Sequence, residues 1–294
     1  MEWQGGRRSD NVDDAGRGGG MGRPLAFGGG AVGIIGAILF YLLTGQVPDV
    51  QTQAPSQVGP QSQAQGPRTA AEQQQREFVS VVLASTEDTW TAVLPNQARI
   101  QYQPPRLTLF EESVESACGF AQSAMGPFYC PPDQRVYLDI SFFNQLSRMG
   151  APGEFARAYV IAHEVGHHVQ NLLGIEQRVM QMRRASRSRE SSNALSVLTE
   201  LQADCYAGVW AHHANANYKS SGKEQLIQPS DIESGLAAAA SVGDDRLQRQ
   251  SRGYVTPESF THGSSAQRVS WFKTGMQTGE LRACDTFGKA GVRL

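Results

Sequence analysis

The residues best suited to chemistry form a short run, His163-Glu164-Val165-Gly166-His167, which has the pattern H-E-x-x-H. On a helix, side chains four residues apart lie on one face, so His163 and His167 can direct two imidazoles at one zinc ion. Glu164 lies one residue further round, where it can take a proton from a water held by the metal. Hydrogen-bonded core histidines are the alternative interpretation. The stretch is otherwise apolar, however, and each unsatisfied buried polar group would cost roughly 2–7 kcal/mol.

A catalytic zinc site needs a third protein ligand. No further histidine follows at the spacing H-x-x-G-x-x-H, so the ligand must come from another segment. The best candidate is Glu200, within a second apolar-periodic segment over residues 194–214. Asp204 lies one helical turn further on, where it would accept the outward N–H of His163 and fix its tautomer. A solvated acidic helix face is the alternative, but the apolar neighbours of Asp204 favour burial.

The elements that position these side chains are expected to be two long helices. The first ends near Gly174, which can adopt the left-handed conformation of a helix cap. Another helix is predicted over residues 78–94, and short strands over residues 107–110 and 136–140. Long helices with few strands predict an α+β fold, mainly helical with a small sheet.

The chain divides by composition into a tail, a membrane segment, a linker and one soluble domain. Residues 1–24 are rich in Gly, Arg and Asp and lack apolar periodicity, which predicts a disordered cytoplasmic tail. Residues 45–75 are rich in Gln and Pro, which predicts a linker. Residues 76–294 then form the soluble domain. The formal net charge of −2 indicates no nucleic-acid partner.

Residues 25–44 carry no charge and are long enough to span a bilayer. Four arginines precede this run, and no Lys or Arg follows before Arg68. The positive-inside rule therefore predicts a single-pass anchor with a cytoplasmic N-terminus and a periplasmic or extracellular domain. A cleaved signal peptide is the alternative.

The four cysteines, Cys118, Cys130, Cys205 and Cys284, suggest two disulfides in an exported domain. Cys118 with Cys130 is the obvious local pair, which would leave Cys205 with Cys284. Four cysteines allow three pairings, and the sequence does not choose among them. The absence of any C-x-x-C motif disfavours a cysteine zinc site.

Together the motifs resemble a known family. H-E-x-x-H followed by E-x-x-A-D looks like the glutamate-ligand, thermolysin-like zinc peptidases. Residues 158–170 more closely resemble the neutral zinc metallopeptidases, a bacterial, membrane-anchored group, as do residues 126–131 and 261–264. The resemblance covers about residues 76–290. It implies a zincin-like metallopeptidase domain, a Zn²⁺ cofactor and a peptide or protein substrate.

The resemblance implies two further roles. Thermolysin-like enzymes bring a distant histidine or tyrosine to the oxyanion of the tetrahedral intermediate, and His262, with Arg268 near it, is the candidate. Tyr254 and Tyr206 are runners-up, and a helix cap is the alternative role for His262. Extended substrate would pair with the edge of residues 136–140.

The sequence therefore predicts a membrane-anchored zinc endopeptidase in which His163, His167 and Glu200 hold zinc and Glu164 is the base. A catalytically inactive zincin-fold binding or regulatory module at the cell envelope is the alternative. A zinc amidase would use the same ligands, whereas a structural zinc protein would need a closed four-ligand shell. The sequence names no specific substrate and no oligomeric state.

Overall fold

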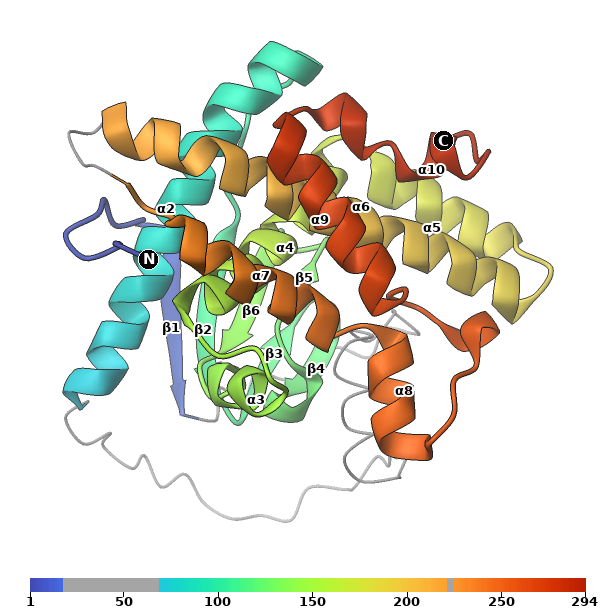
Figure 1. The fold of residues 1–294 in the computed structure, drawn as a ribbon, viewed down its shortest axis with the longest axis horizontal. Helices are drawn as coiled ribbons and strands as arrows, with labels where there is room; N and C mark the ends of the chain where they lie inside the picture. Colours follow the sequence, from blue (N-terminus) through green and yellow to red (C-terminus); the bar gives the residue numbers. More distant parts are fainter. Residues whose placement is uncertain (18–68, 221–224) are drawn as a thin grey trace.

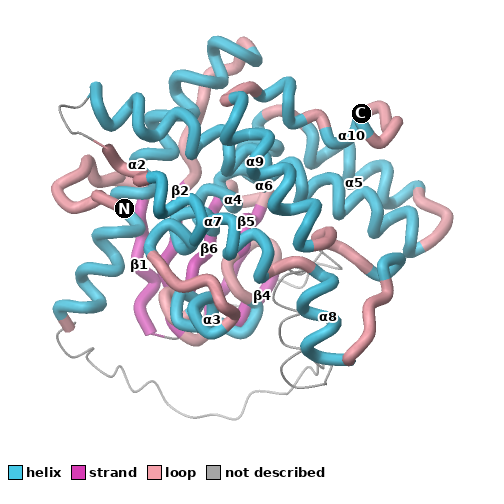
Figure 2. Tube along the Cα trace, viewed as in Figure 1, coloured by secondary structure: helices cyan, strands magenta, loops and turns pink. Residues whose placement is uncertain are grey.

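Helices make up most of the fold and pack against one small mixed sheet (Figure 1, Figure 2). The computed structural model describes residues 1–17, 69–220 and 225–294 of the chain. The expected α+β class, mainly helical with a small sheet, is confirmed. None of the helices in these three ranges is long and apolar enough to cross a bilayer, and the expected anchor, residues 25–44, lies outside them.

The sheet has the strand order β1-β2-β6-β5. Strands β1 (Val12–Arg17), β2 (Arg106–Glu111) and β6 (Arg135–Asp139) run parallel, and β5 (Phe128–Cys130) is antiparallel to β6. Four consecutive residues are buried in β2 and again in β6, as expected for strands covered on both faces. The predicted strands over residues 107–110 and 136–140 are therefore confirmed.

The expectation that residues 136–140 offer a free edge is wrong. β6 is hydrogen-bonded to β2 on one side and to β5 on the other, so its backbone groups are already paired. Within the described residues, β5 is the edge strand at that end of the sheet. A separate hairpin of β3 (Ser113–Ser116) and β4 (Gly119–Gln122) precedes β5.

The first 17 residues belong to the fold, which corrects the predicted disordered tail over that range; residues 18–24 of the predicted tail lie outside the described residues. Val12–Arg17 form β1, in register with β2 from Val12 opposite Leu107 to Arg17 opposite Glu111. Figure 1 shows this blue strand at the sheet edge, beside helix α2. The segment has no local periodicity, and its structure comes from contacts with distant parts of the chain.

The predicted linker also ends earlier than residue 75. Helix α2 (Ala70–Ala98) begins after Thr69, whose side chain accepts a hydrogen bond from the Glu72 backbone in a capping box. The predicted helix over residues 78–94 is confirmed as the middle of α2. The rest of the predicted linker, up to residue 68, lies outside the described residues.

Helix α4 lies between the sheet and other helices, in contact with β5, β6, α6 and α7. The helices that follow α2 are α3 Phe142–Arg148, α4 Glu154–Leu172, α5 Ile175–Ala185, α6 Arg189–Ser220, α7 Pro229–Ser241, α8 Asp244–Arg252, α9 Ser265–Thr278 and α10 Thr286–Lys289. Three short 3-10 turns cover Ser123–Met125, Pro257–Ser259 and Leu281–Cys284. Gly174 takes the expected left-handed conformation between α4 and α5, with φ 71°.

Glycines set the closest approaches between the helices. A Cβ on Gly166 of α4 would lie 3.0 Å from the carbonyl oxygen of Ala203 in α6. A Cβ on Gly275 of α9 would lie 1.8 Å from the carbonyl oxygen of Cys205. At Gly275 there is no room for a side chain, and at Gly166 a Cβ would make an unusually tight contact, so α4 and α9 both pack tightly against the same part of α6.

Both disulfides have the pairing that the sequence favoured, Cys118–Cys130 and Cys205–Cys284. The first joins the β3–β4 hairpin to the end of β5. The second joins α6 to the C-terminal segment, across a sequence separation of 79 residues.

Candidate metal and catalytic site

Helices α4 and α6 bring together the three side chains that the sequence predicted as metal ligands. One potential ligand atom each of His163, His167 and Glu200 lies within 4.8 Å of the others. The Nε2 atom of His163 is 3.2 Å from Glu200 Oε2, and that of His167 is 3.5 Å from Glu200 Oε1. Both imidazoles therefore direct the same nitrogen at one carboxylate.

These separations fit a zinc ion. Bonds of about 2.0–2.1 Å at tetrahedral angles place neighbouring ligand atoms about 3.3 Å apart. The two nitrogen–oxygen separations, 3.2 and 3.5 Å, bracket that value. Two imidazoles and one carboxylate form a donor set that zinc enzymes use, with a fourth position left for water or substrate.

Asp204 supports His163 from the side away from the ligand cluster. Its Oδ1 atom accepts a hydrogen bond from His163 Nδ1 at 2.9 Å, so the predicted contact is confirmed. Tyr159 donates its hydroxyl to the same oxygen. Arg268 donates from Nε to Oδ2 at 2.8 Å and from Nη2 to Oδ1 at 2.9 Å. Arg268 was expected near an oxyanion, but it is only 1% exposed and is bound to Asp204 instead.

This network keeps Asp204 ionised although it is fully buried. Burial alone would raise the pKa of the carboxyl, but the positive charge of Arg268 and the bond from His163 outweigh burial and lower it. Glu200 is also kept ionised. Burial would raise the pKa of its carboxyl, but His167 and His163 outweigh burial and lower the pKa well below its usual value. Both carboxylates are therefore negative where a cation would bind.

A neutral amide supports the second histidine. Gln170 accepts a hydrogen bond from His167 Nδ1 on Oε1 at 2.8 Å. Its Nε2 group donates to the Thr199 carbonyl at 2.8 Å and to Gln202 Oε1 at 2.9 Å, both on α6. Gln170 was not among the predicted site residues. Its position three residues after His167, on the same helix face, was the available signal.

Glu164 lies within the same cluster and is only 2% exposed. Burial raises the pKa of its carboxyl, whereas the two neighbouring histidines lower it less strongly. A carboxylate with a raised pKa is better matched to accepting and returning a proton near neutral pH. The predicted candidate base therefore lies beside the predicted ligands, in an environment that suits proton transfer.

Burial raises the pKa of Glu200, whereas interactions with His167, His163 and, more weakly, His262 lower it, which places His262 in the surroundings of the ligand cluster. His262 is 2% exposed, and Nδ1 donates to Asp244 Oδ1 at 3.1 Å. The Nε2 atom is buried without a hydrogen-bond partner among the described residues. Ser264, rather than His262, caps α9, so the alternative role as a cap is wrong.

Asp244 was not predicted from the sequence. Its Oδ2 atom accepts backbone N–H bonds from Thr261, His262 and Gly263 at 2.7, 2.7 and 3.1 Å. One buried carboxylate thus fixes both the loop and the ring of His262. Because Asp244 is 18 residues from His262 in sequence, no local pattern links the two.

Comparison with known proteins agrees with this geometry. The family model described as "Putative neutral zinc metallopeptidase" matches residues 1–287. The chain belongs to this family. It is 44% identical over 306 aligned residues to the uncharacterized protein YpfJ of Escherichia coli strain K12, covering 99% of this chain and all of that protein. It is 46% identical over 213 residues to the uncharacterized protein Mb2605 of Mycobacterium bovis, covering 71% of this chain and 69% of that protein. No solved structure matches significantly.

The two tyrosines that the sequence offered as runners-up for the oxyanion role lie elsewhere in this zinc metallopeptidase family member. Tyr206 is 2% exposed and packs on Trp90 in the core, and Tyr254 is 62% exposed on the surface. His212 and His213 are bound to the backbone carbonyls of Met276 and Gly279.

His168, the neighbour of the second ligand histidine, joins α4 to the edge strand. Its Nδ1 atom accepts from the Tyr129 hydroxyl at 3.0 Å, and Nε2 donates to the Gln103 carbonyl at 2.6 Å. Both ring nitrogens are therefore occupied away from the ligand cluster. The bond to Tyr129 fixes β5 relative to α4.

Proposed function

We propose that this chain is a zinc-dependent endopeptidase that hydrolyses peptide bonds with an activated water. The observation that carries the proposal is the convergence of two imidazole Nε2 atoms on the carboxylate of Glu200, with the buried carboxyl of Glu164 in the same cluster. Membership of a family described as zinc metallopeptidases supports the same reaction class.

The chain's own groups would divide the chemistry as follows. His163, His167 and Glu200 would hold zinc, which supplies a Lewis acid for the carbonyl and lowers the pKa of water. Glu164 would accept a proton from the attacking water and pass it to the leaving amine. Asp204 and Gln170 would keep the two imidazoles in the tautomer that leaves Nε2 free as a ligand.

His262 is the proposed stabiliser of the oxyanion. Its Nε2 atom is unpartnered and buried, and Asp244 fixes the ring through Nδ1 and the loop through three backbone N–H groups. A protonated Nε2 could donate a hydrogen bond to the oxygen that becomes negative in the tetrahedral intermediate. A donor held in this way is worth roughly 2.7–4 kcal/mol in rate.

We assign the substrate-binding edge to β5 in place of β6. β5 is the edge strand, its pairing to β6 is antiparallel, and Tyr129 within it bonds to His168, the residue after the ligand His167. An extended peptide could add to this edge through backbone hydrogen bonds, which is a general mode of peptide recognition. A peptide or protein is therefore the proposed substrate.

Attachment to a membrane through residues 25–44 is also a proposal. Its support is the uncharged, apolar composition of that run. The two disulfides of the folded domain favour an oxidising, extracytoplasmic location.

The test uses the full chain, purified in detergent, because residues 1–17 form part of the sheet. Zinc content and cleavage of an unfolded protein such as casein are measured for the parent and for Glu164→Gln. We expect about one zinc in each and a loss of turnover of roughly 10²–10⁴-fold in the variant. Glu190→Gln, at an exposed position in the first turn of α6, is the matched control and should keep both properties.

Two outcomes would contradict the proposal. Unchanged turnover in Glu164→Gln would remove the base from the mechanism. Zinc in both proteins with no cleavage of any peptide or protein substrate would favour the alternative, a catalytically inactive zincin-fold module at the cell envelope.

A further inference from the structure

We infer that residues 1–17 and residues 69–294 lie in the same compartment, on one side of any membrane that residues 25–44 enter. This differs from the single-pass topology expected from the sequence, which separates the two parts. The inference is independent of the proposed peptidase activity, because it depends only on how the N-terminal segment, residues 1–17, packs on the domain.

The N-terminal segment contributes a large apolar side chain to the main core. Trp3 is 2% exposed and packs edge-to-face on Phe78 of α2, with ring centroids 5.5 Å apart. Its indole Nε1 donates to Glu154 in the first turn of α4 at 2.8 Å. Withdrawing the segment would expose the Trp3 side chain and the part of Phe78 that it covers, and burial of such area is the main stabilising term in folding.

Polar groups of the segment also have specific partners on α2. Ser9 and Ser80 exchange two hydrogen bonds, from Ser9 N to the Ser80 carbonyl at 3.1 Å and from Ser80 Oγ to the Ser9 carbonyl at 3.0 Å. Glu87, which is 8% exposed, accepts from Ser9 Oγ at 2.5 Å and from Asn11 Nδ2 at 2.9 Å. If these donors were lost, the buried carboxylate of Glu87 would lack these hydrogen-bond partners and the fold would be less stable, so the polar groups of α2 complement this segment.

Strand β1 completes the sheet. It follows β2 along five paired positions, and Asp13 forms an ion pair with Arg106 of β2 and, at 2.7 Å, with Arg135 of β6. Without β1, the apolar strand β2 would become an open parallel edge, which folded proteins avoid. The match of the family model from residue 1 onward is consistent with a segment that belongs to the domain.

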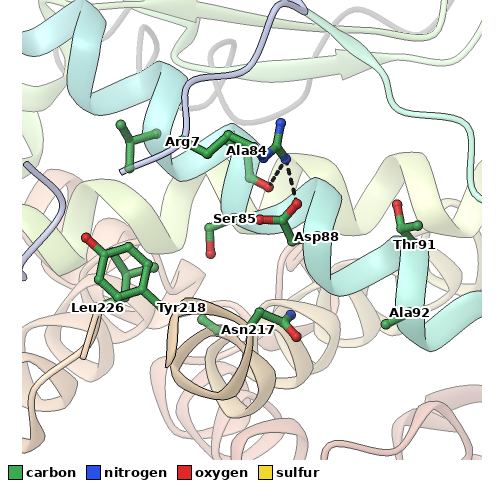
Figure 3. A pocket seen from close by; sticks show the side chains of 11 residues that line it. Arg7, Ala84, Ser85, Asp88, Thr91, Ala92, Asn217, Tyr218 and Leu226 are labelled. Carbon is green, nitrogen blue, oxygen red and sulfur yellow. Dashed lines mark hydrogen bonds and ion pairs between the residues drawn. The ribbon is translucent and has the colours of Figure 1, made fainter. Parts of the chain in front are cut away.

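Two of the four arginines that favoured a cytoplasmic N-terminus, Arg7 and Arg8, have partners in the fold. Arg7 donates from Nη2 to the Ala84 carbonyl and to Asp88 at 2.7 Å each, as Figure 3 shows. Arg8 forms an ion pair with Glu77. These charges complement carboxylates on α2, which gives them a role in docking the segment as well as the role in topology that the positive-inside rule assigns.

Residues that flank the intervening segment on its two sides also lie in contact. Asp14, near the end of β1, forms an ion pair with Arg76, in the first part of α2. A chain that crosses a bilayer once between residues 17 and 69 would separate these side chains by the hydrocarbon core, about 30 Å thick. A molecule in which residues 1–17 are docked on the domain therefore cannot also cross the bilayer once between residues 17 and 69.

Cysteine accessibility in the full chain tests the inference directly. Asp10→Cys reports on the N-terminal segment and Arg187→Cys on the loop between α5 and α6, and both positions are exposed. Spheroplasts are treated with a membrane-impermeant maleimide before and after permeabilisation, and the parent chain gives the background from its native cysteines. We expect the two variants to label alike. Labelling of one only in intact spheroplasts, and of the other only after permeabilisation, would overturn the inference.

A second measurement tests the docking itself. Trp3→Ala in the purified full chain should lower the melting temperature by roughly 6–20 °C, as expected for loss of a buried tryptophan from a domain of this size. Asp10→Ala, at an exposed position in the same segment, should leave the melting temperature unchanged. An unchanged melting temperature for Trp3→Ala would show that the segment is not docked and would overturn the inference.

Discussion

The variant Asp204→Asn tests what the negative charge of this carboxylate contributes to stability and to zinc binding. Asn keeps the size of the side chain and an oxygen that can accept from His163 Nδ1, but it removes the negative charge. Arg268, which is 1% exposed, would then be a buried cation without its anion. Breaking a buried ion pair on one side costs about 3–5 kcal/mol. Loss of the charged partner of a ligand histidine typically costs 10–100-fold in metal affinity.

The double variant Asp204→Asn with Arg268→Met tells the two effects apart. Met fills much of the space of the arginine stem and removes the unpaired charge, so the free energy of unfolding should recover by about 2 kcal/mol or more. Zinc affinity should not recover, because His163 still lacks its anionic acceptor. Denaturant unfolding of the metal-free protein and competition with a zinc chelator measure the two quantities.

One pattern of results would refute the reasoning. If zinc affinity falls in Asp204→Asn and returns fully in the double variant, the carboxylate acts only by holding Arg268 and the fold in place. Unchanged zinc affinity in Asp204→Asn would likewise remove Asp204 from the support of the metal site.

Three further predictions concern packing, pH and the disulfides. Gly166→Ala should weaken zinc binding with little change in helix content by circular dichroism, because a Cβ 3.0 Å from the Ala203 carbonyl oxygen requires a small shift of α6, the helix that carries Glu200. Unchanged zinc affinity would contradict this. Burial lowers the pKa of His168 from 6.5 to about 4, so the folded state loses about 3 kcal/mol of stability as the pH falls from 6.5 to 4. Denaturant unfolding of His168→Gln should show a correspondingly smaller loss, and equal losses would refute it. Replacing Cys205 and Cys284 by Ala should cost about 1.5 kcal/mol more than replacing Cys118 and Cys130, because the sequence separations are 79 and 12 residues, and a reversed order in denaturant titration would argue against a chain-entropy origin.

The sequence predicted the spacing of site residues within each helix, and it predicted one kind of contact between the two helices. The spacing of His163 and His167, and of Glu200 and Asp204, follows from the helical repeat, which is a local property. The contact between Asp204 and His163 could be predicted because a ligand histidine needs an acceptor on its second nitrogen. Gln170 met the same local criterion, since it lies one turn after His167, and it could have been found in this way.

Residues 1–17 and Asp244 could not be found in this way. The sequence of β1, Val-Asp-Asp-Ala-Gly-Arg, has low strand propensity, and its pairing with β2 decides its conformation. Asp244 acquires its role only when the loop from Thr261 to Gly263 folds over it. The order of the strands could not be predicted either. β6 lies between β2 and β5 in the sheet, and the sequence of a single strand does not show which strands pair with it.

The contacts along α6 restrict where residues can be inserted into or deleted from this chain. Between Thr199 and Gly208 nearly every side chain is buried, and successive residues face the metal cluster, Gln170, Arg268, the disulfide and the closely packed α9. One inserted residue would rotate all later positions by about 100° around the helix axis. Insertions and deletions should therefore be absent from this stretch throughout the family. Length differences between relatives should accumulate instead in exposed connections such as the one between α5 and α6.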